Sequence, residues 1–274
     1  MSIKKVMIFG SIIIALLILF YCIWFFFINI KYELPEIDSS LTEEELGINF
    51  SEEISTSISN NTENELKQLV ESSPKNMKYL NDLRLVMKDE LDEYINYLEE
   101  LEINNEEIHL QKALAYVDKL QDPQLGTGRL GQISNLSINE LQEVLSINEN
   151  NWFAYYARGL NNLYWPIGLK RIDNAIQELA FCVSISIEYN HIDNPLWPDA
   201  YVAYGDALIK KGEIEEGIQV WKDGLNRFPN HEELLNRENL DSDQAYSLVK
   251  SERGIDSFQR PKEHITDLGI LWGN

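Results

Sequence analysis

Residue types that carry chemistry are sparse in this chain of 274 residues. It contains four histidines, at positions far apart in the sequence: His109, His191, His231 and His264. None of them has a second metal ligand at the spacing of a zinc site. The sequence also lacks a Gly-x-Ser-x-Gly motif and a phosphate-binding loop. We therefore expect no metal site, no cofactor and no enzymatic activity.

One nucleotide-binding pattern does occur, because Gly126, Gly128 and Gly131 fit G-x-G-x-x-G. That pattern has meaning only between a strand and a helix of a strand-helix-strand unit. Here it follows a predicted helix that ends near Gln121. We interpret residues 122–134 as a loop that separates an N-terminal hairpin from the helices after it.

Aromatic residues concentrate in the predicted helix 152–164 and the turn that follows it: Trp152, Phe153, Tyr155, Tyr156, Tyr164 and Trp165. One stripe of this helix, including Trp152 and Leu163, is expected to form the core between helices. The remaining aromatics can be buried only if something covers the other face. An extended peptide, an apolar ligand or the chain's own C-terminal tail would suit that face.

The helical pattern is clearest in residues 197–231. It predicts the kind of element that positions the aromatic residues. Tyr201, Tyr204 and Leu208 form an apolar stripe on a first helix, which Gly212 ends. Ile218 and Trp221 lie on a second helix. A hairpin of this size cannot bury its own apolar face, so neighbouring hairpins must stack on it.

This hairpin resembles one repeat, of about 34 residues, of the tetratricopeptide repeat (TPR) family. The resemblance is carried by these residues and their spacing: Tyr201, Tyr204, Gly205, Leu208, Gly212, Gly217, Trp221, Gly224 and Pro229. It extends, with an enlarged repeat and a preceding half repeat, over residues 136–231. The expected fold class is therefore all-α, a stack of antiparallel helix hairpins with an N-terminal transmembrane helix.

The resemblance also implies a concave groove that binds a protein or peptide. The candidate binding residues are the expected groove positions and one aromatic of the enlarged turn: Phe153, Tyr156, Leu160, Tyr164, Trp165, Val202 and Asp206. TPR proteins that bind C-terminal carboxylates use Lys, Arg and Asn in this groove. The residues here differ, so that particular ligand is disfavoured.

Residues 6–30 contain no charged side chain and are long enough to cross a bilayer as a helix. Lys4 and Lys5 precede them, which places residues 1–5 in the cytoplasm and the rest of the chain outside it, in the periplasm or extracellular space. A cleavable signal peptide is the alternative, but its apolar region would be shorter and would end in small residues. An uncleaved single-pass anchor in the cell membrane is the prediction.

The formal net charge of -22 argues against nucleic acid as a partner, since phosphate contacts need clustered Lys and Arg. Residues 31–74 are rich in Asp and Glu and are predicted to form an acidic stalk. Two short helices are possible within the stalk. One would follow Thr42 and Glu45, which are spaced as a capping box, and the other would cover residues 63–70.

Residues 77–101 show a heptad stripe broken by Arg84. A coiled-coil dimer is one interpretation. We prefer a hairpin within residues 75–122, because a second helix is predicted after Asn105. Residues 232–274 are expected to form capping helices and a tail whose apolar residues dock in the groove: Leu268, Ile270, Leu271 and Trp272.

Together these features predict a non-enzymatic, membrane-anchored, TPR-like adaptor for protein interaction or assembly in the cell envelope. The alternative function is suggested by a resemblance to the periplasmic TPR components of solute transporters, in which the stack binds a small apolar ligand.

Overall fold

The computed structural model describes residues 14, 17–19, 33–48, 62–262 and 265–272. The chain divides into two compact units, residues 1–33 and 34–274. Within the described part, every helix falls short of the length and apolar character needed to cross a membrane. The predicted anchor, residues 6–30, lies outside the described residues except for Ile14 and residues 17–19.

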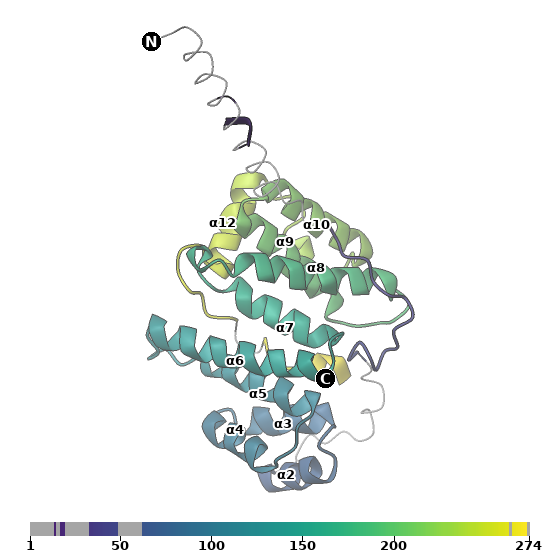
Figure 1. The fold of residues 1–274 in the computed structure, drawn as a ribbon, viewed down its shortest axis with the longest axis vertical. Coiled ribbons are helices and arrows are strands. Elements are labelled where there is room, and N and C mark those ends of the chain that lie inside the picture. The colour runs from purple at the N-terminus through teal and green to yellow at the C-terminus, as the bar shows by residue number, and fades with distance from the viewer. Residues whose placement is uncertain (1–13, 15–16, 20–32, 49–61, 263–264, 273–274) are drawn as a thin grey trace, which may run out of the picture. The chain divides into compact units, whose positions relative to one another are not determined.

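All regular elements described in the second unit are helices, and consecutive helices pack against each other (Figure 1). In chain order they are α2 (Glu63–Ser72), α3 (Met77–Val86), α4 (Leu91–Glu100), α5 (Glu106–Lys119), α6 (Thr127–Ile147), α7 (Trp152–Leu163), η2 (Ile167–Leu169), α8 (Ile172–Glu188), α9 (Trp197–Lys211), α10 (Ile214–Arg227), α11 (Glu232–Leu235), α12 (Ser242–Arg253) and η3 (Gly269–Trp272). The all-helical prediction is confirmed for these residues.

The pair α9 and α10 shows why glycines lie inside its helices. A Cβ on Gly205 would overlap the indole of Trp221, and a Cβ on Gly217 would lie 2.6 Å from the carbonyl oxygen of Gly205. The two backbones therefore approach closely where neither residue has a side chain. Gly212 ends α9 in the left-handed region, with φ of 109°. Trp221 is buried and donates its indole N–H to the carbonyl of Val202 at 3.2 Å.

The pair α7 and α8 is held by a similar buried tryptophan. Asn151 caps α7 by accepting the N–H of Ala154 at 2.8 Å. Trp152 then donates its indole N–H to the carbonyl of Cys182 on α8 at 3.1 Å and stacks on Tyr156, with ring centroids 5.0 Å apart. Cys182 is a buried free thiol. This side of α7 is closed by α8, so a ligand can reach α7 only from its other side.

The heptad stripe of residues 77–101 is not one helix, which corrects the prediction. The chain leaves the helix after Val86 and resumes it at Leu91, as α3 and α4. Tyr94 on α4 donates its hydroxyl to the carbonyl of Leu80 on α3 at 3.0 Å. The break lets the apolar residues of both helices reach one buried cluster with α2 and α5, instead of forming a coiled-coil seam.

The predicted loop at residues 122–134 is also wrong over most of its length. Helix α6 begins at Thr127, with Gly126 as its N-cap, so Gly128 and Gly131 are helical. Leu130 and Ile133 are buried against Leu120. This burial offsets the low helix propensity of the two glycines, each of which costs about 1 kcal/mol relative to alanine.

Part of the predicted acidic stalk packs on the helices. Leu46 is buried, and its carbonyl accepts the N–H of Trp152 at 2.8 Å. Thr42 and Glu45 form the reciprocal hydrogen bonds of a capping box, at 2.7 and 3.2 Å. The hydroxyl of Tyr189 donates toward the carbonyls of residues 38 and 41, each at 2.9 Å. The end of residues 33–48 thus differs from a solvated spacer, because Leu46 and Ile48 are buried, whereas Leu34 is exposed.

Candidate functional site

The most distinctive contact of the fold involves residues 254–272, which we call the tail. The tail leaves α12 at Gly254, whose φ of 63° lies in the left-handed region. Its described residues 255–262 and 265–268 have no regular secondary structure, and η3 follows them. Near its start, the carbonyl of Ile255 accepts the N–H of Ile167 at 2.9 Å. The N–H of Gln259 donates to the carbonyl of Tyr164 at 3.1 Å. The tail is thereby fixed to the C-terminal end of α7.

The middle of the tail is bound by the end of α5 and the turn after it. Gln121 donates its side-chain amide to the carbonyl of Pro261 at 3.0 Å. In the reverse direction, Arg260 of the tail donates to the carbonyls of Leu120 at 2.9 Å and of Asp122 and Leu125 at 3.0 Å. The carbonyl of Leu120 lies at the C-terminal end of α5, where free acceptors attract a cation, and those of Asp122 and Leu125 lie in the turn after it.

The far part of the tail is bound by a buried arginine. Arg84 of α3 is 0% exposed and donates to both the carbonyl and the hydroxyl of Thr266. Its other donors reach Gln111, Asn81 and the carboxylate of Asp118. Asn81 also accepts the N–H of the tail residue Leu268 at 3.2 Å. Arg84, which interrupts the apolar stripe of the sequence, is therefore a tail-binding residue.

Most of these contacts satisfy main-chain groups of the tail, and the exceptions involve the side chains of Arg260 and Thr266. Five tail residues have a main-chain N–H or carbonyl bonded to the helices or turns: Ile255, Gln259, Pro261, Thr266 and Leu268. Main-chain contacts hold a peptide in place without reading its side chains. We call the surface that makes them the tail site, defined by Asn81, Arg84, Gln121, Tyr164 and Ile167.

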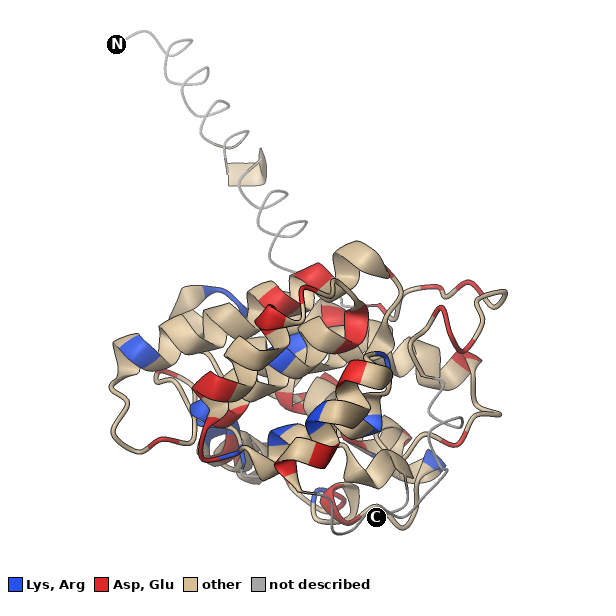
Figure 2. Cartoon of the chain, turned by 90° about the horizontal axis from the view of Figure 1, so that it is seen from below, with Lys and Arg blue, Asp and Glu red and all other residues tan. Residues whose placement is uncertain are grey.

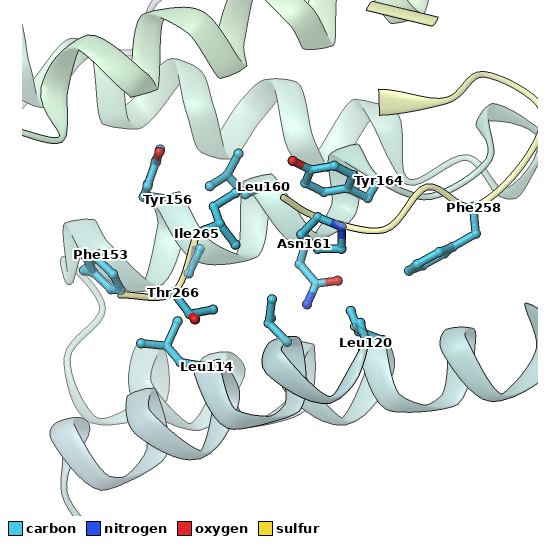
Figure 3. Close-up of a pocket in the computed structure, with 13 residues that line it drawn as sticks. Leu114, Leu120, Phe153, Tyr156, Leu160, Asn161, Tyr164, Phe258, Ile265 and Thr266 are labelled. Atoms are coloured by element: carbon cyan, nitrogen blue, oxygen red, sulfur yellow. The ribbon is translucent and has the colours of Figure 1, made fainter. Parts of the chain in front are cut away.

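Between the tail and helices α5 and α7 lies an apolar cavity of about 40 Å³. Figure 3 shows Leu114 and Leu120 below it, Phe153 and Leu160 on the other side, and Ile265 of the tail between them. The full lining is Leu114, Val117, Leu120, Phe153, Tyr156, Ala157, Leu160, Asn161, Tyr164, Phe258, Pro261, Ile265 and Thr266. The tail thus covers the aromatic face of α7 but leaves part of the space unfilled.

The structure brings together most, though not all, of the sequence-predicted site residues. Phe153, Tyr156, Leu160 and Tyr164 line the cavity. Trp165 meets the tail through an edge contact with Phe258, with ring centroids 5.7 Å apart.

Val202 and Asp206 lie on α9 and are not among the cavity residues. Val202 is buried, and its carbonyl accepts the Trp221 indole.

Asp206 is the centre of a buried charge cluster instead. It is 0% exposed and accepts from Arg253 at 2.7 Å and from Arg237 at 3.3 Å. Burial by itself would lower the pKa of Arg253, but Tyr164 and Asp206 raise it above its ordinary value. Arg253 also donates to the hydroxyl of Tyr164, so the charge cluster and the tail site share that residue.

Lys210, one turn after Asp206, is bonded to three carbonyls. Its amine is buried and donates to Leu163 at 2.8 Å and to Trp165 and Arg253 at 2.9 Å. Three N–H donors of a charged amine match three acceptors. Burial, together with the guanidinium of Arg253, lowers the pKa of Lys210 to about 7. Lys210 joins the end of α12, where the tail begins, to the end of α7.

Charge elsewhere on the surface is mixed. Figure 2 shows Asp and Glu distributed over many of the described helices, with Lys and Arg dispersed among them. The described residues contain no group of three or more His, Cys, Asp or Glu that could hold a metal ion. The most specific contacts to the tail come from individual side chains beside it, above all Arg84.

Sequence reasoning missed the residues that bind the tail main chain, namely Asn81, Arg84 and Gln121. The only sequence signal for them was the charged residue in the apolar stripe of residues 77–101. Comparison of the chain with protein-family models, with curated proteins and with solved structures gives no significant match. For the residues that the structure describes, fold and site define an all-helical protein whose helices bind a segment of its own chain.

Proposed function

We propose that this protein is a non-enzymatic adaptor of TPR-like architecture, which binds a peptide segment of a partner protein at the tail site. In this proposal residues 6–30 anchor it in the cell membrane, and the helical unit acts outside the cytoplasm, in the cell envelope. The partner segment replaces the tail. The observation that carries the proposal is the main-chain recognition of the tail at five residues.

The geometry favours a peptide over the alternative of a small apolar ligand bound by a solute-transport component. Pockets for small molecules have volumes of about 300–1,000 Å³. The cavity next to the tail measures about 40 Å³. The hydrogen-bonding groups of the tail site, from Asn81 to Tyr164, meet main-chain groups at intervals along a chain. A small apolar molecule would leave these groups without partners.

A binding experiment in the full-length chain tests the proposal. A variant with Phe258→Asp and Leu268→Asp places charges at the buried Leu268 and at the partly buried Phe258, which packs on Trp165; this should release the tail and leave the tail site intact. A fluorescent peptide with the sequence of residues 255–272 should bind this variant and raise its fluorescence anisotropy. The unmodified chain should bind at least tenfold more weakly, because its tethered tail competes at high effective concentration.

Adding Arg84→Gln to the released variant should abolish peptide binding, whereas adding Arg129→Gln, at an exposed position of α6, should not. Circular dichroism checks that each variant keeps its helices. A released variant that keeps its helices and does not bind the peptide would refute the proposal.

A further inference from the structure

The chain's own tail does not fill the tail site completely. The cavity of about 40 Å³ lies between Ile265 of the tail and the aromatic face of α7 (Figure 3). It is lined mostly by apolar side chains, among them Leu114, Phe153 and Leu160. The atoms around unfilled apolar space lose packing contacts.

Tail residues line the cavity at four positions: Phe258, Pro261, Ile265 and Thr266. The side chain of Thr266 is held by Arg84 and that of Phe258 packs on Trp165, so Ile265 is the position at which a larger side chain can enter the cavity. Tail main-chain groups at Gln259 and Leu268 are fixed by hydrogen bonds on either side of it. The tail therefore cannot shift along the site to fill the space without losing those bonds. A larger side chain at the position of Ile265 can reach it without moving the main chain.

We propose that the partner is a peptide that follows the main-chain path of the tail and carries phenylalanine or a side chain of similar size where the tail has Ile265. This inference rests on the proposed function and names the chemistry of its ligand. The tail then competes with the partner for the same site but packs there less completely. A partner with the larger side chain therefore displaces the tail.

The lining residues explain why an aromatic ring suits the space. Phe153 and Tyr156 present ring carbon atoms from α7, and Leu114 and Leu120 present methyl groups from α5. Aromatic rings pack edge to face with such neighbours. The lining is mostly apolar and contains no charged residue, so a charged side chain at position 265 would lose hydration there without gaining an ion-pair partner.

Two peptides of residues 255–272, one natural and one with Ile265→Phe, test the inference on the released variant described above. Cavity energies per unit volume predict that the phenylalanine peptide binds about fivefold more tightly. A third peptide with Ile265→Asp should bind more weakly than the natural one. Equal or weaker binding of the phenylalanine peptide would overturn the inference while leaving the proposed function in place.

The same substitution in the intact chain gives a second measurement that does not depend on binding of an added peptide. Ile265→Phe should slow hydrogen exchange at Leu268 by about fivefold, because it stabilises the closed tail. Ile270→Phe, at an exposed position of the tail, is the control and should leave that rate unchanged. If neither peptide binds, the proposed function fails. In that case an unchanged exchange rate at Leu268 in the Ile265→Phe chain would also refute the claim that phenylalanine fills the cavity.

Discussion

Replacing Asp206 with alanine is expected to lower the free energy of unfolding by about 3–5 kcal/mol. The carboxylate is fully buried and lies between the guanidinium groups of Arg237 and Arg253. Arg237 keeps Glu233 and Glu252 as partners after the substitution. Arg253 has no other carboxylate within ion-pair distance among the described residues, so its buried charge would lose its compensation. Urea unfolding followed by circular dichroism measures the loss.

Asp199 provides the matched control on the same helix. It is partly exposed, and its ion-pair partner is His231 at 3.3 Å. Asp199→Ala should change the free energy of unfolding by less than about 1 kcal/mol, as partly exposed pairs usually do. If Asp206→Ala cost no more than Asp199→Ala, the charge cluster would not have the structural role that we assign to it.

The second large effect is expected for Arg84→Ala, which should lower the free energy of unfolding by about 3–5 kcal/mol. The substitution leaves the buried acceptor of Gln111 and the carbonyl of Thr266 without this donor, and it removes the ion-pair partner of Asp118. It also creates a cavity where the long side chain lay. Since one of these acceptors belongs to the tail, the tail should detach at its far end as well.

Arg129→Ala is the control for Arg84, because Arg129 is exposed and contacts only Gln132 among the described residues. Its effect should stay within about 0.5 kcal/mol. Limited proteolysis adds a structural readout, since the Arg84→Ala chain should be cut in the tail much faster than the control. Equal rates of cleavage in the two variants would show that Arg84 does not hold the tail.

The helix pairs of α7 to α10 could be predicted from sequence because their determinants are local. Gly212 and the apolar spacing around Trp221 lie within one hairpin, and the observed helices agree with the predicted ones. The break between α3 and α4 could not be predicted in this way. It depends on Tyr94 reaching Leu80 and on burial against α2 and α5, which spacing within one segment does not reveal.

The candidate site was predictable in part for the same reason. The aromatic surplus on α7 indicated that its second face is covered, and Phe153, Tyr156 and Leu160 do line one cavity. The groups that bind the tail main chain could not be found, because their partners are distant in sequence. Arg84 and Thr266, for example, are 182 residues apart. Asp206 was assigned to a groove, whereas the arginines of later segments enclose it.

The central claim is that the tail occupies the site as an internal peptide ligand, and hydrogen exchange of the full-length chain tests it most directly. The main-chain amides of Gln259 and Leu268 donate to the carbonyl of Tyr164 and to the side chain of Asn81. Both amides should exchange at least a hundredfold more slowly than in a free peptide of residues 255–272. Exchange of these two amides at the rate of the free peptide would contradict the account.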